Sequence, residues 1–371
     1  MSQTVQVMRN NITETRLVER DLPALPENAI RLRVESFAVT ANNVTYAVAG
    51  DAFGYWNFFP GEDGWGVVPM WGHAVIEASN HADIAVGERV YGYLPMAAHL
   101  DVLPVNLSAG GFSDDAAHRQ PMSPIYNQYS RLAADPEHDG AKEAERMIFG
   151  PLFKTGFLIE SMMRREAWFG AEALVCTSAS SKTAMATASV ARDKSPQIKR
   201  IGLTSAGNVE FVRAGGFYDL VLAYDEAADL PQVASVAVDF AGNAALLHHV
   251  HTALGDHLRY SCTVGATHVG AGFGRDNGEL PGPKPVLFFA PDHAMASIKE
   301  LGPKGFGQAV GASWTKFLGE TAGAIAVDER VGLAAARAAF GDILAGHADP
   351  AVGGLDSALK SRGAEPLLIT V

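Results

Sequence analysis

Short apolar runs alternate with helix-like segments between about Ala173 and Thr263, and this alternation constrains the fold more than any other feature of the chain. The apolar runs are "ALVCTS", "KRIGLTS", "FYDLVLAYD", "ASVAVDFAG" and "LRYSCTVGAT", and segments such as "NAALLHHVHTALG" lie between them. Strands that alternate with helices form a parallel sheet with helices on both faces. The sequence therefore predicts an α/β domain in this region.

The first third of the chain has the pattern of short strands broken by Gly, Pro and Asn. The clearest examples are "AIRLRVESFAV", "WGVVPMWGHAVIEAS" and "DIAVGERVYGYLP", which predict a β-rich domain. Residues 106–146 are polar with little periodicity, and both a lid and a plain surface excursion stay open for them. "MIFGPLFKTGFLIESMMRR" then predicts a helix, and the tail predicts the helix "VGLAAARAAFGDILAGHADP" followed by the strand "PLLITV".

Composition excludes several classes of protein. A chain of 371 residues favours two domains, and a net charge of −12 argues against a nucleic-acid partner. The only two cysteines, Cys176 and Cys262, lie in apolar runs, so we expect reduced core thiols and no four-cysteine zinc site. The N-terminus has no signal-peptide pattern, and no apolar segment is long enough to span a membrane. We expect a cytoplasmic enzyme.

The stretch "ALVCTSASSKTAMATASVAR" predicts a strand, a tight turn without glycine, and a helix. A helix N-terminus binds phosphate through its free N–H groups, and Lys182 adds a positive charge. An ATP-type phosphate loop is excluded, because its two glycines would be Cys176 and Ser181. A serine-capped helix start is the alternative, but the surrounding strand–helix series favours a dinucleotide site. The small polar residues predicted to line it are Ser178, Ser180, Ser181 and Thr183.

The order of these stretches resembles the medium-chain dehydrogenase/reductase superfamily, on its zinc-independent, quinone-oxidoreductase-like side. The matching stretches cover nearly the whole chain and include "AVTANNVTYAVAGD", "WGHAVIEA", "VGERVYGY", "FKTGFLIES", "ALVCTSASSKTA" and "VAVDFAG". The resemblance implies an α/β fold with a Rossmann-type parallel-sheet domain, residues 151–312, inserted into a chaperonin-10-like β-rich domain, residues 1–150 and 313–371. The departures from the family pattern indicate an outlying subfamily.

The resemblance also implies NADPH or NADP as the cofactor. The family's glycines would fall at Thr177, Ser180 and Thr183. An NAD site needs an acidic side chain after the second strand, whereas the residues there are Thr204, Ser205 and Asn208. The family's usual lysine in this turn is replaced near Asn208 and Val209, and Tyr224 matches a tyrosine that related NADPH enzymes bring to the 2′-phosphate.

Further cofactor residues follow from the resemblance. Thr155 in "FKTG" matches a threonine that contacts the nicotinamide amide in relatives. Thr263, Gly265 and Ala266 close the fifth strand, where the nicotinamide half should lie. Phe288 and Phe289 resemble a strand that lines the pocket and pairs across a dimer, so we expect a homodimer; a plain buried strand is the alternative.

The resemblance places the ligands of the zinc-dependent relatives at Asn42, His73 and roughly Pro151. Because a catalytic zinc needs three protein ligands, we expect no metal. For His73 an active-site role and a simple strand contact both stay open. Without zinc, hydrogen-bond donors must polarise the substrate oxygen, and Asn42, Tyr46 and Tyr55 are the candidates. Simple packing of the loop is the alternative for the aromatic residues.

These observations predict an NADPH-dependent, zinc-independent oxidoreductase that transfers hydride to an activated carbonyl or conjugated alkene of a small molecule. Two alternatives keep the cofactor: a lyase or isomerase without net redox, and a non-catalytic NADPH-binding sensor.

Overall fold

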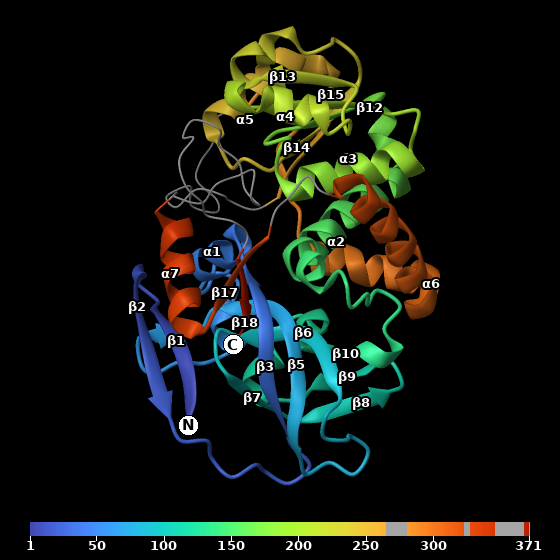
Figure 1. Cartoon of the computed structure of the whole chain (residues 1–371). Coiled ribbons are helices and arrows are strands. Elements are labelled where there is room, and N and C mark those ends of the chain that lie inside the picture. The colour runs from blue at the N-terminus through green and yellow to red at the C-terminus, as the bar shows by residue number, and fades with distance from the viewer. Residues whose placement is uncertain (265–279, 323–326, 346–366, 371) are drawn as a thin grey trace. The chain divides into compact units, whose positions relative to one another are not determined.

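The computed structural model describes residues 1–264, 280–322, 327–345 and 367–370, which divide into two compact units (Figure 1). The first unit holds residues 1–148 together with 327–345 and 367–370. The second unit holds residues 149–264 and 280–322. The sequence placed the return to the first domain at residue 313, but helix α6 (Ala290–Thr321) stays in the second unit. It does so because its Trp314 and Phe317 rings pack 5.2 Å from the ring of Phe153.

The second unit contains a six-stranded parallel sheet in the order β13-β12-β11-β14-β15-β16. Chain order reverses between β11 and β14, and ligands of such sheets bind outside the strand ends at that switch point. The predicted Rossmann-type parallel sheet is confirmed. Its strands are β11 (Ala173–Cys176), β12 (Lys199–Thr204), β13 (Leu220–Ala223), β14 (Ser235–Asp239), β15 (Leu258–Thr263) and β16 (Val286–Leu287).

Helices pack on this sheet because their apolar residues and the β-branched strand residues form common cores. One core joins strand residues such as Val175, Ile201 and Ala237 to Leu246 and Val250 of the helix α5. Four helices accompany α6 in this region, and α2 begins in the first unit. They are α2 (Glu143–Arg165), α3 (Lys182–Lys194), α4 (Val209–Ala214) and α5 (Ala244–Leu254).

The first unit is β-rich, as predicted. A nine-stranded sheet has the order β17-β18-β3-β5-β6-β10-β9-β8, with β7 paired to β3, and a three-stranded sheet has the order β2-β1-β4. Helices α1 (Ala41–Val48) and α7 (Leu333–Leu344) accompany them. The strands are β1 (Ser2–Met8), β2 (Asn11–Arg20), β3 (Ile30–Val39), β4 (Trp65–Gly66), β5 (Pro69–Ser79), β6 (Arg89–Pro95), β7 (His99–Val102), β8 (Pro104–Ser108), β9 (Gly111–Asp114), β10 (Gln128–Arg131), β17 (Asp328–Val331) and β18 (Leu367–Thr370).

The polar stretch 106–146 is neither a lid nor a plain surface excursion. Its strands β9 and β10 pair with each other and β10 pairs with β6, so the stretch extends the large sheet. Arg119 is fully buried and donates hydrogen bonds to Asp114 at 3.0 Å and to Tyr129 Oη at 2.8 Å. A buried polar network therefore holds together a segment that lacks an apolar pattern.

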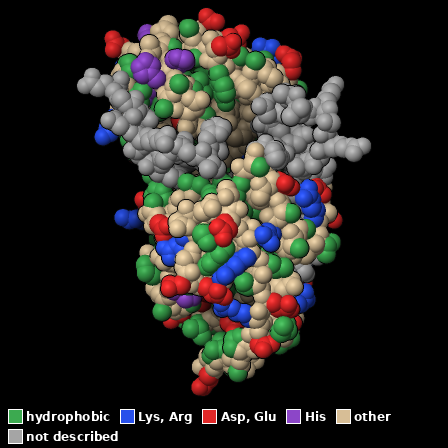
Figure 2. All heavy atoms as spheres, turned by 90° about the vertical axis from the view of Figure 1, so that its left-hand side faces the viewer, with side chains coloured by type: hydrophobic (Ala, Val, Ile, Leu, Met, Phe, Trp, Pro, Cys, Tyr) green, Lys and Arg blue, Asp and Glu red, His purple; other side chains and the backbone are tan. Residues whose placement is uncertain are grey.

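Two general expectations concern the cysteines and membrane-spanning segments. Cys176 and Cys262 are free and buried, as predicted, and burial raises the pKa of both thiols. None of the helices formed by the described residues is both long and apolar enough to cross a membrane. Figure 2 shows acidic and basic side chains mixed over the visible face of the first unit.

Candidate functional site

The glycine-free turn between β11 and α3 lies at the switch point of the parallel sheet. Ser181 caps α3, and its Oγ accepts a hydrogen bond from the N–H of Ala184 at 3.3 Å. Ser178 has φ of +47°, a left-handed conformation that residues other than glycine rarely adopt. The N–H groups of Lys182 and Thr183, the first two residues of α3, have no partner within the helix, so they are available to an anion at this position.

Thr177, at the first of the expected glycine positions, joins the turn to β14 through hydrogen bonds. Its Oγ1 donates a hydrogen bond to Asp239 Oδ1 at 2.5 Å. The same oxygen accepts hydrogen bonds from the N–H groups of Phe240 at 2.9 Å and Ala241 at 3.2 Å. Asp239 is buried, and burial raises the pKa of its carboxyl group. The hydroxyl of Thr177 is thus committed to joining the two central strands.

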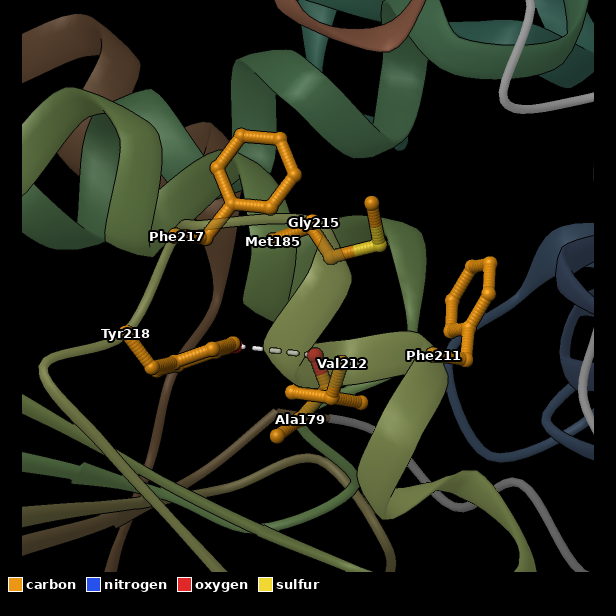
Figure 3. Close-up of a pocket in the computed structure, with 7 residues that line it drawn as sticks. All are labelled: Ala179, Met185, Phe211, Val212, Gly215, Phe217 and Tyr218. Atoms are coloured by element: carbon orange, nitrogen blue, oxygen red, sulfur yellow. Dashed lines mark hydrogen bonds between the residues drawn. The ribbon is translucent and has the colours of Figure 1, made fainter.

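The other side of the turn is fixed to β12. Ser180 Oγ accepts a hydrogen bond from Thr204 Oγ1 at 3.2 Å. Tyr218 Oη donates to the carbonyl oxygen of Ala179 at 3.0 Å, and Figure 3 shows the Tyr218 ring directed at the turn beside a small apolar pocket. A Cβ on Gly202 would lie 2.8 Å from Ala179 Cβ. The close approach of the turn to β12 therefore depends on Gly202 in the strand and not on a glycine in the turn.

Close packing of α3 also uses a glycine outside the turn. A Cβ on Gly156 of α2 would lie 2.7 Å from the Thr187 nitrogen and 2.9 Å from the Thr183 oxygen. The neighbouring Thr155 is half-buried, and its Oγ1 donates to the carbonyl oxygen of Pro151 at 3.0 Å. Thr183 is half-buried in the first turn of α3.

Lys182 is the first residue of α3, and only 8% of it is exposed. Its Nζ lies 5.8 Å from the ring centre of Phe149 on α2. Burial lowers the pKa of this amine to about 7, and no acidic group in the part of the chain that the structure describes contributes to the shift. A buried cation without a counter-ion is unfavourable, which distinguishes Lys182 from a lysine on a solvated helix face.

The end of β12 carries uncharged polar groups, as the sequence indicates. Thr204 and Asn208 are buried, and Ser205 Oγ is buried with no hydrogen-bond partner among the residues that the structure describes. Tyr224 is half-buried directly after β13. These positions hold no carboxylate that would repel a 2′-phosphate.

Strand β15 ends at Thr263, and the structure describes one further residue, Val264, before the gap at residues 265–279. The carbonyl oxygen of Thr263 accepts a hydrogen bond from the N–H of Phe288 at 2.9 Å. Phe288 is buried and Phe289 precedes α6, whereas Val286 and Leu287 of β16 are exposed. The predicted cofactor residues Gly265 and Ala266 lie outside the described residues.

The predicted catalytic residues Asn42, Tyr46, Tyr55 and His73 all belong to the first unit, and three of them meet beside α1. Asn42 Nδ2 donates to Tyr46 Oη at 2.6 Å, and Trp71 Nε1 donates to the same oxygen at 3.3 Å. The rings of Tyr46 and Tyr55 lie 4.7 Å apart. Burial raises the pKa of Tyr46, so this phenol keeps its proton at neutral pH. Asn42 orients Tyr46 rather than facing open space.

His73 of β5 is fully buried and pairs with Tyr91 of β6, with ring centres 5.1 Å apart. Neither ring nitrogen has a hydrogen-bond partner among the described residues. Burial lowers the pKa of His73 to about 3, so the ring is neutral. Within the described part of the chain, no three His, Cys, Asp or Glu side chains gather as a metal site.

Sequence reasoning missed three residues: Asp239 and Tyr218 at the turn before α3, and Arg146, which lies over the ring of Tyr91 beside His73. Asp239 had a visible signal, because an acidic residue ends the otherwise apolar run "ASVAVDF". Tyr218 and Arg146 had none: their partners, Ala179 and the ring of Tyr91, are distant in sequence.

Comparison with solved structures finds full-length similarity at low identity. CurA from Vibrio vulnificus in complex with NADPH is 13% identical with a TM-score of 0.57, covering 99% of this chain and 98% of that one. A Pseudomonas syringae quinone oxidoreductase is 13% identical with a TM-score of 0.57 and complete coverage of both chains. S. aureus TarJ in complex with NADPH is 8% identical with a TM-score of 0.54, covering 100% and 98%. The fold that the superfamily resemblance implied is confirmed.

Sequence comparisons are less informative about activity. No curated protein matches the chain significantly. One family model matches residues 37–349, most of the chain, and is described as "Protein of unknown function (DUF2855)". The chain therefore belongs to this family.

Proposed function

We propose that this protein is an NADPH-dependent oxidoreductase that transfers hydride to a carbonyl or conjugated alkene of a small molecule. The observation that carries the proposal is Lys182, a buried amine at the start of α3 that has no acidic partner among the described residues. The adjacent N–H groups of α3 and this amine together suit a phosphate anion. Two structural neighbours, CurA and TarJ, are complexes with NADPH.

The residues present fit NADPH better than NADH. Ser205 Oγ is a buried hydroxyl without a partner among the described residues, at the strand end where a dinucleotide's ribose is bound. Asn208 and Tyr224 are the neighbouring candidates for the 2′-phosphate, and neither carries negative charge at neutral pH. Thr155 is the candidate for the nicotinamide amide, and Lys182 for a phosphate.

When bound, the nicotinamide supplies a hydride, and this chain must stabilise the charge that develops on the substrate. Tyr46 is suited to donate a hydrogen bond, because Asn42 and Trp71 both donate to its oxygen and hold it in place. Donors fixed in a buried site contribute about 2.7–4 kcal/mol to a transition state. A homodimer and a cytoplasmic location complete the proposal.

The test uses NADPH deuterated at the transferable position and a panel of aldehydes, ketones, enones and quinones. Deuterium should appear in the reduced product, and Tyr46→Phe should lower kcat by roughly 10²–10³-fold while NADPH still binds. Tyr129→Phe, at another buried tyrosine of the first unit, is the matched control and should remain active. Conversion of any compound without label transfer, internal return excluded, would favour a lyase or isomerase. Binding of NADPH without turnover of any panel member would favour a sensor.

A further inference from the structure

Two buried side chains of the first unit, His73 and Arg146, have four nitrogens without hydrogen-bond partners among the described residues. They are Nδ1 and Nε2 of His73 and Nε and Nη1 of Arg146. His73 is fully buried and Arg146 is 3% exposed. Buried polar atoms are almost always hydrogen-bonded to protein, water or a ligand. Both side chains lie against the ring of Tyr91, so their unpaired nitrogens require a common explanation.

Burial of an arginine does not by itself produce unpaired nitrogens in this protein. Arg119 is buried at least as deeply, and all three of its nitrogens donate hydrogen bonds. Arg31, 8% exposed, forms a two-bond ion pair with Asp101 at 2.7 Å. Arg131 and Arg200 each have a buried Nε without a hydrogen-bond partner, but among the described arginines only Arg146 has two such nitrogens.

The unpaired nitrogens of His73 and Arg146 lie on the face of the sheet that also carries Trp71, which donates a hydrogen bond to Tyr46. Arg146 Cζ lies 4.1 Å above the ring of Tyr91, and the His73 ring lies 5.1 Å from that ring. Trp71 and His73 are two residues apart in β5, so they share one face. The Trp71 ring stacks 5.7 Å from Tyr91, and its Nε1 donates to Tyr46. One continuous face thus leads from Tyr46 to Arg146.

Charge at this site is already balanced. Arg146 Nη2 donates to Asp135 Oδ2 at 2.5 Å, which neutralises the guanidinium. Glu143 accepts hydrogen bonds from Arg89 at 2.8 Å and lies 2.8 Å from His138 Nε2. These contacts outweigh burial and lower the pKa of Glu143 to about 2, so it stays ionised.

The unpaired groups are mainly donors. In a neutral imidazole one nitrogen donates and the other accepts, and both free nitrogens of Arg146 donate. Because a carboxylate already faces Arg146 and Glu143 faces His73, a second anion would meet repulsion. A neutral acceptor, the oxygen of a carbonyl group, satisfies the donors without that cost.

We propose that Arg146 and His73 form a binding subsite for a neutral carbonyl group of the substrate. The subsite deepens the proposed function, on which it rests, by selecting ketones, aldehydes, esters or amides over carboxylates. Arg146 and His73 donate to the carbonyl oxygen, and the aromatic face of Tyr91 and Trp71 packs against the carbon skeleton.

The test uses N-cyclohexylformamide as the probe, because its carbonyl does not accept a hydride readily, and cyclohexanecarboxylate as the charged counterpart of similar size. Isotope-edited infrared spectroscopy of ¹³C-labelled formamide should show saturable binding and a lowered carbonyl stretching frequency. The carboxylate should bind at least tenfold more weakly than the formamide.

Two double variants separate the subsite from general stability. Arg146→Met/Asp135→Asn removes the subsite's charge pair without leaving a lone buried charge, and should weaken formamide binding at least tenfold. Arg31→Met/Asp101→Asn removes the ion pair of Arg31 in the same unit and should leave binding unchanged. His73→Phe, which keeps a ring, should also weaken formamide binding.

Three outcomes overturn the proposal. Formamide binding that survives Arg146→Met/Asp135→Asn, or tighter binding of the carboxylate, contradicts a neutral carbonyl at Arg146. Absence of formamide binding to the wild-type protein means that ordered water alone satisfies these nitrogens. A separate NADPH titration tests the proposed function, because the residues of this subsite all belong to the first unit; its failure would leave the formamide result standing.

Discussion

At the scale of single residues, burial decides what a charged side chain can do. The buried Arg119 is surrounded by acceptors and serves as a structural centre. Lys182 is buried with no acidic partner among the residues that the structure describes, and its pKa falls to about 7. We interpret Arg119 as a structural residue of the fold and Lys182 as part of an anion-binding site.

Lys182 provides a prediction about protons. If a phosphate of the cofactor lies beside this amine, its pKa rises on binding, so NADPH binding takes up a proton between about pH 7 and the pKa of the bound form. Calorimetric titration at pH 8 in buffers of different ionisation enthalpy measures that uptake. It should disappear in Lys182→Met, and an equal uptake in the variant would remove Lys182 from the cofactor site.

The lowered pKa of Lys182 also determines how the free energy of unfolding changes with pH. The unfolded chain binds more protons than the folded one between about pH 7 and 10.5, so stability from this group increases as pH rises through that range. In the absence of cofactor, Lys182→Met should therefore be stabilising at pH 7 and nearly neutral at pH 10.5. Urea denaturation at both values measures the difference.

Single residues also show what sequence could not predict. The cap at Ser181 was visible because it depends on neighbouring positions. The role of Thr177 was not visible, because its partners lie at the end of β14 and directly after it, 62–64 residues later in the chain. The resemblance marked the position as a glycine site, whereas the fold uses its hydroxyl as a link.

At the scale of elements, strands and helices with clear periodicity were predicted well. The strand–helix series of the second unit appears in the expected order, because local pattern determines it. The strands β8 to β10 were missed, because a buried ion pair and hydrogen bonds stabilise them in place of an apolar pattern. The partners in these polar contacts cannot be predicted from the sequence pattern alone.

The link between β11 and β14 supports a prediction at this scale. Thr177→Val should destabilise the second unit by about 1–3 kcal/mol, because Asp239 and two N–H groups lose a buried partner. Thr177→Ser keeps the hydroxyl and is the matched control. Urea denaturation followed by circular dichroism measures both, and equal stability of the two variants would mean that the link contributes nothing.

At the scale of the whole molecule, the exposed edge of the parallel sheet bears on assembly. Val286 and Leu287 of β16 are 50% and 45% exposed, and an apolar edge strand favours pairing with another chain. We expect a two-fold homodimer through this edge. Light scattering should give a dimer for the wild type and a monomer for Leu287→Glu, while Val331→Glu, an exposed position in β17, should remain dimeric. A wild-type monomer at working concentration would reject this assembly.

The position of β18 has a consequence for biosynthesis. This strand, Leu367–Thr370, lies between β17 and β3 in the sheet of the first unit, whereas the strands of the parallel sheet all come from residues 173–287. On the ribosome, β3 is translated early, and its partners β5 and β7 follow soon after it, but its partner β18 emerges more than 300 residues later. The second unit can therefore close its sheet first, whereas the edge of β3 that pairs with β18 stays open until residues 367–370 have been made. An open strand edge of this kind favours aggregation.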